Sequence, residues 1–426
     1  MNTNSRILLT AEPYGFGPSS KALAIARELT ETHAVRAYFT GIGTAYSAAT
    51  REAGLFRAIS TSARYDADVL TEEVRGHDLV ISVMEPSLAL AAAAEEVPCL
   101  YVDSLFWMWD WPDEIADFQG PEEQLIHRLT DGSRQQRHGA LREAVNLPMH
   151  KAQYVAHRVA TQVCYQRYGG DAEPTRSRAR DACAAKPIGA IIDRVPTARR
   201  LRGDSPALIV SVSGLSNEFT KKSYATGWAQ SVIDTIADAI KGTAFEGSGT
   251  RVGGNADLLG TLSAGGRRSL EIKPWHSHED FMLDLSRAAV FAAPPGITSI
   301  AESWAVGVPF FALPIQHYAH ASILQRLRGS HAEAFPGIDV GATPATGDLS
   351  EMTTNVLDSV IADLREGARA RTAAVDHLRE FLAGLAENRA TLIARQDLRL
   401  SQLFGSADGA SEAVREAHLL CRVASQ

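Results

Sequence analysis

Short apolar runs alternate along this chain with longer segments whose apolar residues recur at helical spacing. The first run is residues 6–11, and a predicted helix follows it, with Ser19 or Ser20 as the expected N-cap. Repeated strand–helix alternation is typical of a parallel sheet with helices on both faces. The pattern predicts strands at residues 34–40, 78–84, 98–103, 207–213, 269–273, 290–293 and 310–313, with weaker candidates at 161–165 and 187–192.

Residues 194–206 interrupt the alternation, because they carry Pro, Gly and several Arg with few apolar residues. We therefore predict an N-terminal domain at residues 1–195, a linker at 196–206 and a second domain at 207–395. The tail is mostly helical by pattern, and residues 396–426 are predicted as a separate C-terminal helix. The predicted fold class is α/β, with two Rossmann-like domains and a helical C-terminal tail.

Composition narrows the class of protein. The chain has 426 residues, 45% of them hydrophobic, and a formal net charge of −8, as is usual for a soluble globular protein. The acidic balance argues against a nucleic-acid or anionic-membrane partner held by bulk charge. We expect a cytoplasmic protein, since we identify neither a signal segment nor an apolar run of about 18 residues. Free thiols are expected for the four cysteines, which lack metal-ligand spacing: Cys99, Cys164, Cys183 and Cys421.

The stretch 288–320 carries the clearest candidate site. An apolar strand at 290–293 stops at Pro294-Pro295-Gly296, a helix is predicted over 300–306, and Gly307-Val308-Pro309 separates that helix from the next strand. The turn therefore lies at the carboxyl end of a strand and at a helix N-terminus. Backbone N–H groups in that position bind anions, so the turn is a candidate phosphate site.

A structural interpretation of the same residues carries about equal weight on pattern alone. Ser299 and Glu302 have the spacing of a capping box, in which the serine caps the helix and the glutamate reaches back to a free N–H. Such boxes are common. The residues themselves leave both interpretations open.

Three carboxylates end strands or lie in the loops that follow them: Glu12, Glu85 and Asp103. Each is a candidate general base and equally a candidate capping or loop-ordering acid. The aromatic run 105–111 is either a buried core segment or the wall of a pocket. Asp66-Ala67-Asp68 has the spacing of a metal-binding motif, but it begins a predicted helix, so we interpret these acids as helix-start residues and predict no metal site.

The stretch 288–320 resembles the donor-binding core of inverting, metal-independent glycosyltransferases with the two-Rossmann GT-B fold. In order, the matching residues are Gly296, Ser299, Glu302, Gly307, Val308 and Pro309. The resemblance implies that the Gly turn holds a nucleotide diphosphate, that Glu302 binds the ribose hydroxyls and that the C-terminal helix crosses back to the first domain. The remaining residues it implies for the nucleotide are Ser213, Gly214, Trp275 and Thr298, and for the donor sugar Gln316 and His317. Four histidines are expected to flank this site: His276, His278, His317 and His320.

On the acceptor side, the loop after the first strand takes the place of the Gly-His loop of the family. Pro18 stands roughly where that family carries its catalytic His, so the usual base is absent. Glu85 comes closest to the position of a catalytic Asp in plant-type relatives. The expected acceptor-binding residues are Tyr14, Phe16, Gly17, Phe106 and Trp107.

Two further stretches, the opening of the chain and the Pro-Pro-Gly turn, resemble the cytosylglucuronate synthases of peptidyl-nucleoside antibiotic pathways. This resemblance implies transfer of glucuronate from UDP-glucuronate to N1 of cytosine or hydroxymethylcytosine, with the UDP-sugar as substrate and no cofactor. The alternatives are transfer to another small natural product from a UDP- or dTDP-hexose, a sugar-nucleotide epimerase or hydrolase, and a catalytically silent helper protein. The intact Gly296 and Glu302 pattern argues against the last.

Overall fold

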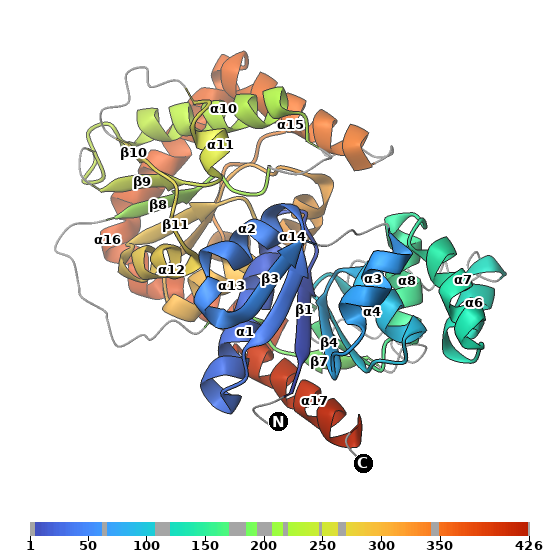
Figure 1. The fold of residues 1–426 in the computed structure, drawn as a ribbon. Helices are drawn as coiled ribbons and strands as arrows, with labels where there is room; N and C mark the ends of the chain where they lie inside the picture. The colour runs from blue at the N-terminus through green and yellow to red at the C-terminus, as the bar shows by residue number, and fades with distance from the viewer. Residues whose placement is uncertain are drawn as a thin grey trace. The chain divides into compact units, whose positions relative to one another are not determined.

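A computed structural model describes residues 5–61, 66–106, 120–169, 185–193, 207–215, 220–246, 249–262, 270–341 and 349–424. The chain divides into two compact units. Unit 1 comprises Met1–Asp193 with Gln402–Gln426, and unit 2 comprises Arg194–Ser401. Each unit contains one parallel sheet with helices packed on it, which confirms the predicted fold class (Figure 1). The predicted linker at 196–206 lies outside the described residues.

The sheet of unit 1 has seven parallel strands in the order β3-β2-β1-β4-β5-β6-β7. The strands that follow β1 in the chain, β2 and β3, lie on one side of it, and β4 to β7 lie on the other side. The direction in which the chain crosses the sheet therefore reverses between β1 and β4. Open α/β sheets bind ligands at such a point, beyond the carboxyl ends of the strands. The strands are β1 (Ile7–Ala11), β2 (Ala37–Gly41), β3 (Phe56–Thr61), β4 (Leu79–Val83), β5 (Cys99–Asp103), β6 (Gln162–Gln166) and β7 (Lys186–Ile188).

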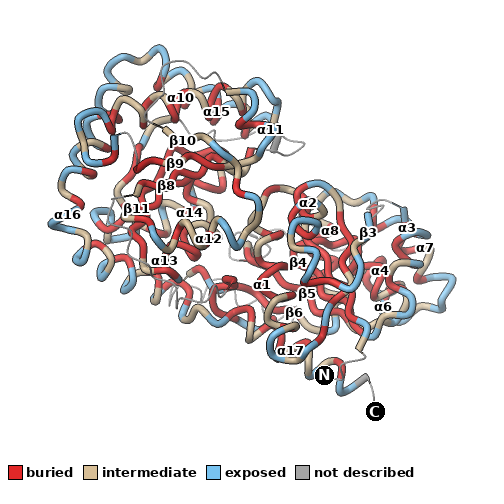
Figure 2. Tube along the Cα trace, turned by 60° about the vertical axis from the view of Figure 1, so that its left-hand side comes forward, coloured by how far each residue is buried: buried red, intermediate tan, exposed pale blue. Residues whose placement is uncertain are grey.

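Helices cover both faces of this sheet, because successive side chains of a strand point to opposite faces. Ile7 and Leu9 of β1 belong to a core shared with α1 and α17, whereas Leu8 belongs to the core of the opposite face. Figure 2 shows the strands as a buried layer in each unit. On one face lie α1 (Phe16–His33), α2 (Gly43–Arg51) and α17 (Gly409–Ala424); on the other lie α3 (Ala67–Val74), α4 (Pro86–Ala94), α6 (Pro121–Thr130), α7 (Arg134–Ala144) and α8 (Met149–Val159).

Five parallel strands form the sheet of unit 2, in the order β10-β9-β8-β11-β12. Its core centres on Trp228 of α10, which is fully buried with residues of β8, β9 and β11. The strands are β8 (Leu208–Ser211), β9 (Thr250–Gly253), β10 (Glu271–Ile272), β11 (Val290–Ala293) and β12 (Phe310–Ala312). The helices are α10 (Lys222–Ile240), α11 (Ala256–Leu259), α12 (His278–Arg287), α13 (Ile297–Val306), α14 (Tyr318–Arg328), α15 (Leu349–Arg365) and α16 (Ala368–Phe404).

Two strands were missed by the sequence pattern. In β3 every residue after Phe56 is at least partly exposed, so this edge strand lacks an apolar run. The region around 247–254 is rich in Gly and has no apolar run, yet it contains β9. Pairing with β8 and β10 stabilises β9, and such non-local hydrogen bonds leave no local signal.

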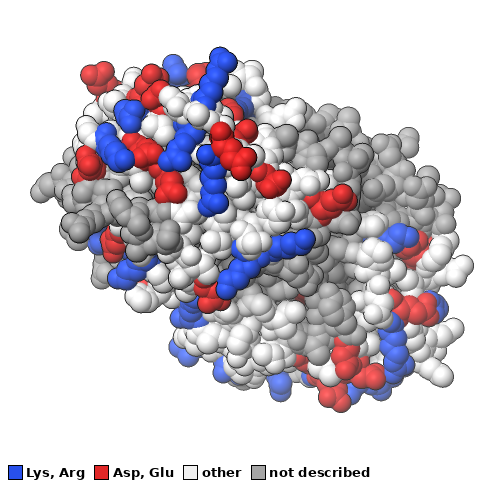
Figure 3. Space-filling model, turned by 90° about the horizontal axis from the view of Figure 1, so that it is seen from above, with Lys and Arg blue, Asp and Glu red and all other residues white. Residues whose placement is uncertain are grey.

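The tail of the chain is helical, as predicted, and consists of α15, α16 and α17. The boundary between the two units falls within α16, slightly later than the predicted boundary at 395–396. Ala413 and Ala417 of α17 are buried in the core that α1 covers in unit 1. Among the described residues, no helix is both long and apolar enough to cross a membrane. On the face drawn in Figure 3, described cationic and anionic side chains lie interspersed.

Candidate functional site

In unit 2, the candidate site is built on three neighbouring strands at the point where the strand order reverses. Gly214 follows β8, Gly296 follows β11 and Gln316 follows β12, and these strands are adjacent in the sheet. Because parallel strands end at the same edge, the three loops share the carboxyl edge where ligands bind in this class of fold.

The N-terminus of helix α13 lies at this edge of the sheet. It begins at Ile297, with Gly296 as an N-cap that has an extended backbone and supplies no side-chain hydrogen bond. Ser299 therefore lies in the first turn and does not cap the helix, so the capping-box interpretation, one of the two left open by the sequence, is wrong. The predicted end is confirmed, because Gly307 is a left-handed C-cap at φ 66°. Because Gly296 has no side chain, no N-cap side chain accepts from the first turn of α13, and helix N-termini of this kind bind anions through backbone N–H groups.

The predicted ribose ligand, Glu302, lies on α13 and is only 5% exposed. Its Oε1 is 3.4 Å from Nε2 of His278, the first residue of α12, and both side chains are largely buried. This contact forms an ion pair when His278 is protonated, and it holds the carboxylate at the site. His278 is one of the four histidines expected here; His276, by contrast, is exposed.

Gln316 is the residue that most directly indicates a ligand. It is 1% exposed, and its Nε2 is buried with no hydrogen-bond partner among the described residues. Leaving such a donor unsatisfied costs about 1–3 kcal/mol. Its Oε1 lies so close to Gly214 that a Cβ there would be 2.7 Å away, and Gly214 has φ 101°. Only glycine suits this position, which fixes the glutamine against the loop after β8.

Two histidines follow Gln316, His317 and His320, and their rings are in contact at an interplanar angle of 37°, with ring centroids 3.7 Å apart. Burial lowers the pKa of His317 to about 4, and burial followed by the neighbouring His317 holds the pKa of His320 well below its usual range. Both rings are neutral at neutral pH. His317 therefore supplies no positive charge for a uronate carboxylate, although its neutral ring can still donate a hydrogen bond.

Trp275 is buried and held on several sides. Its Nε1 donates to Asp284 Oδ2 at 2.9 Å, Arg251 lies over its ring at 5.5 Å, and Gly253 of β9 packs directly on the ring. A role against the nucleotide base stays a prediction. The fixed position of Trp275 depends on Gly253, because any Cβ there would overlap the indole.

The remaining predicted donor residues lie at the same edge. Ser213 follows β8, its N–H donates to Ser211 Oγ at 3.4 Å, and the two hydroxyls are 3.1 Å apart. Thr298 and Ser299 are partly exposed residues of the first turn of α13. The structure thus brings together the loops after β8, β11 and β12.

In unit 1, the three predicted carboxylates follow β1, β4 and β5, which are adjacent. All three carboxylates lie near the phenol of Tyr101. The pKa of Tyr101 is raised well above its usual range, mainly by burial and then by the negative charges of Asp103, Glu12 and Glu85. This convergence at the switch point of unit 1 was predicted from the strand ends. It does not give the three acids the same role.

Asp103 is 0% exposed, and its carboxylate lies 3.0 Å from His157 Nε2 and accepts from Leu105 N at 2.6 Å. Glu85 is also buried and caps α4 by accepting from Ser87 N at 3.0 Å. These contacts match the capping and loop-ordering alternative for both residues. Glu12 is the partly exposed member of the three, so it is the best placed to meet an acceptor.

A buried network around Asp103 was missed by sequence reasoning. Tyr101 donates to Gln153 Oε1, Gln153 Nε2 donates to Met84 O at 2.9 Å, and His157 Nδ1 lies 2.6 Å from Gln153 O. Met84 has φ 57°, a strained conformation for a non-glycine residue next to Glu85. Gln153 and His157 are four residues apart on the mostly apolar face of α8, and that spacing was the signal available in the sequence.

The predicted acceptor loop joins β1 to α1. This helix begins at Phe16 with Gly15 as N-cap at φ 92°, so the predicted caps Ser19 and Ser20 are wrong. Tyr14 and Gly17 are partly exposed in the same loop and first turn. Thr44 Oγ1 donates to Pro13 O at 2.5 Å and Gly15 O at 2.8 Å, which fixes the loop against α2.

Phe106, also predicted for the acceptor, is buried and stacks on Tyr165 with ring centroids 4.7 Å apart. For this residue the core interpretation of the aromatic run agrees with the structure. Trp107 lies outside the described residues. The interpretation of Asp66 as a helix-start acid is confirmed, because it caps α3 by accepting from Asp68 N and Val69 N.

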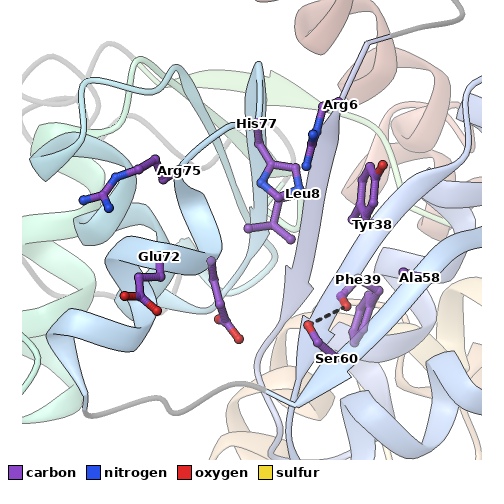
Figure 4. A pocket seen from close by; sticks show the side chains of 10 residues that line it. Arg6, Leu8, Tyr38, Phe39, Ala58, Ser60, Glu72, Arg75 and His77 are labelled. Atoms are coloured by element: carbon purple, nitrogen blue, oxygen red, sulfur yellow. Dashed lines mark hydrogen bonds between the residues drawn. The ribbon is translucent and has the colours of Figure 1, made fainter.

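Unit 1 also contains a cavity of about 270 Å³ (Figure 4). Arg6 immediately precedes β1, His77 lies two residues before β4, and together they form one end of the cavity. Leu8, Tyr38 and Ser60 line it from strands of the sheet. Arg6, Leu8, Tyr38 and His77 lie toward the amino ends of the strands, whereas Ser60 is near the carboxyl end of β3. The cavity is separate from the candidate site, since Glu12, Glu85 and Asp103 are not among the residues that line it.

No protein-family model matches the chain, and no curated protein matches it. Solved structures match over nearly its whole length. Os79 from O. sativa in complex with UDP is 14% identical, with 92% of this chain and 100% of that chain covered and a TM-score of 0.52. A UGT transferase from Siraitia grosvenorii in complex with UDP is 12% identical, with 98% and 100% covered and a TM-score of 0.51. These similarities establish the fold, which is the GT-B fold of glycosyltransferases.

Proposed function

We propose that this protein is an inverting, metal-independent glycosyltransferase that moves a sugar from a UDP-sugar to a small acceptor. The observation that carries the proposal is the buried, unpartnered Nε2 of Gln316 at the edge where α13 presents an uncapped N-terminus. A buried donor and a helix N-terminus together suit a phosphorylated, hydroxyl-rich ligand. Both similar structures carry UDP, which supports the choice of nucleotide.

The proposed chemistry assigns a separate task to each unit. The acceptor attacks the anomeric carbon while the bond to the diphosphate oxygen breaks and its electron pair passes to the diphosphate. Backbone N–H groups of the first turn of α13 stabilise that growing charge. Glu12 takes the acceptor proton, because Glu85 and Asp103 are buried in structural contacts.

For the acceptor, we propose N1 of cytosine or hydroxymethylcytosine, in nucleoside antibiotic biosynthesis. A pyrimidine nitrogen needs less help from a base than a hydroxyl does, and Pro18 occupies the place where a catalytic histidine was expected. Tyr14, in the loop after β1, and Phe16, the first residue of α1, are partly exposed and would contact a flat ring.

UDP-glucuronate is the donor we propose. The loop after β12 carries Gln316 and His317 and no carboxylate, so a uronate meets no like charge from these two residues. With His317 neutral, the carboxylate is recognised by uncharged donors such as Gln316 Nε2.

Incubating the purified protein with a panel of UDP-sugars, with and without cytosine, tests this function. Mass spectrometry should find UDP and a cytosine–sugar conjugate only when both substrates are present. Sugar release without cytosine would indicate a hydrolase, and a rearranged UDP-sugar would indicate an epimerase. Failure to bind UDP in calorimetry, together with no turnover, would overturn the proposal in favour of a silent helper protein.

A further inference from the structure

His320 lies at the donor edge of unit 2 in a defined orientation. It is the third residue of α14, it is 7% exposed, and its side chain lies between the loop after β12 and the turn after β11. A Cβ placed on Gly296 would be 3.7 Å from its Nε2. The imidazole therefore borders the N-cap of α13, the helix whose N-terminus forms the anion site.

The hydrogen bonds of His320 define its tautomer. The backbone N–H of Gln316 donates to His320 Nδ1 at 3.2 Å, so Nδ1 is the acceptor. In a neutral imidazole the other nitrogen then carries the proton. Burial keeps the pKa of His320 well below its usual range, and the neighbouring His317 is a second cause. The ring of His320 is therefore neutral at neutral pH. His320 thus presents an Nε2–H donor.

That donor has no hydrogen-bond partner among the described residues, and it faces the N-cap Gly296. A donor held in place by a backbone hydrogen bond and by contact with the ring of His317 needs no reorganisation to bind an anion. A neutral donor also avoids the cost of placing a bare cation in a buried position when the site is empty.

We propose that His320 is a catalytic residue that donates its Nε2–H to the diphosphate of the nucleotide donor. This inference rests on the proposed function and adds a side-chain contact to the backbone donors of α13. As the bond between the anomeric carbon and the diphosphate oxygen breaks, its electron pair passes to that oxygen. The hydrogen bond from His320 strengthens with this charge, and His320 keeps its proton throughout.

Two substitutions at this position separate the donor from the structural contact. In His320→Asn, the side-chain oxygen can still accept from Gln316 N near the position of Nδ1, but the Nε2–H is lost. In His320→Gln, the amide nitrogen reaches the position of Nε2 and restores a donor. His331→Asn is the matched control, because it makes the same substitution at a histidine beyond the C-terminal end of α14, whereas His320 lies in the first turn of that helix.

The readouts are turnover and the affinities for UDP and UMP by calorimetry, since UMP lacks the second phosphate. We expect His320→Asn to lower kcat by about 10²–10³, the effect of removing one oxyanion donor. It should weaken UDP more than UMP, and His320→Gln should recover much of both losses. His331→Asn should keep the wild-type kcat and UDP affinity.

The failures of the two proposals can be told apart. If the wild-type protein binds no UDP, the proposed function itself fails. If it binds UDP and turns over, but His320→Asn retains the wild-type kcat and UDP affinity, the role of His320 is overturned. Equal losses in His320→Asn and His320→Gln, with UMP weakened as much as UDP, would also overturn it and indicate a purely structural histidine. Thermal unfolding of each variant checks that it is folded.

Discussion

Gln316 and Gly214 lie so close together that a methyl group on the glycine would stand 2.7 Å from the glutamine Oε1. The two residues come from the loops after β12 and β8, which are not adjacent in the chain. Their contact orients a buried amide at the carboxyl edge of the sheet in unit 2. Enlarging the glycine tests this relationship.

Gly214→Ala should impair donor binding. The added Cβ meets Gln316, and a non-glycine residue at φ 101° costs about 1–3 kcal/mol in strain. We expect a fall in UDP-sugar kcat/KM of about tenfold or more, because about 1.4 kcal/mol corresponds to a factor of ten. Gly139→Ala is the control, since Gly139 lies in α7 with open space around its Cβ position. Equal activity in the two variants would contradict the prediction.

Glu302→Ala should weaken UDP binding by about 1.5–3 kcal/mol if this carboxylate accepts from the ribose hydroxyls. Calorimetric titration of UDP into the folded variant measures the loss. The capping-box interpretation, in which Ser299 is the N-cap, does not apply, because Gly296 is the N-cap of α13. Unchanged affinity in Glu302→Ala would exclude the ribose assignment, whatever happens to the free energy of unfolding.

Glu12→Gln and Asp103→Asn should separate catalysis from stability. We expect Glu12→Gln to lower kcat by roughly 10²–10⁴ with UDP affinity retained, as for loss of a general base. Asp103→Asn leaves His157 in a fully buried site without its carboxylate, so it should lower the free energy of unfolding by about 3–5 kcal/mol. Near-normal kcat in Glu12→Gln would show that the base lies elsewhere or that none is used.

Gln316→Asp should change the preference for the donor sugar. A carboxylate at this position would repel a uronate by about 1–4 kcal/mol at 4 Å, for effective dielectrics between water and a protein surface. We therefore expect kcat/KM for UDP-glucuronate to fall more than that for UDP-glucose. Competition kinetics with both donors gives the ratio directly. A wild-type enzyme that already prefers UDP-glucose would contradict the choice of donor.

We expect the protein to lose stability in acid, because His317 and His320 are in contact and have lowered pKa values. The folded pKa of His317 is lowered to about 4 by burial, below its unfolded value of about 6.5. Unfolding therefore takes up protons between these values, and the free energy of unfolding falls as the pH drops from about 6.5 to 4. The contribution of His317 is on the order of 2 kcal/mol, since its side chain is partly exposed.

Urea denaturation at pH 7.5 and pH 4.5 tests this linkage. The difference in free energy of unfolding between the two pH values should be smaller in His317→Asn than in the wild type, by on the order of 2 kcal/mol. The comparison reports His317 together with its effect on His320, because His317 also lowers the pKa of His320. The same pH dependence in both proteins would show that His317 contributes nothing.

Sequence pattern alone determined the two-domain α/β class and the position of the donor turn. Apolar runs such as β1 and β11, and the Pro294–Gly296 turn that ends β11, are local features whose burial can be read from neighbouring residues. The end of α13 at Gly307 was also predictable, because a left-handed C-cap favours glycine. Its start was not, since Gly296 leaves no side-chain capping signal.

Only the tertiary structure decided which polar residues have structural contacts and which remain available to bind a ligand or to act in catalysis. Asp103 and His157 are far apart in the chain, and only the packing of α8 on the sheet buries them together and removes Asp103 from the candidate bases. In the same way, Gly214, Gly296, Gln316 and His320 meet because β8, β11 and β12 end side by side. Local periodicity records whether a residue is buried, whereas partners and tautomers depend on contacts between distant segments, which a single sequence does not specify.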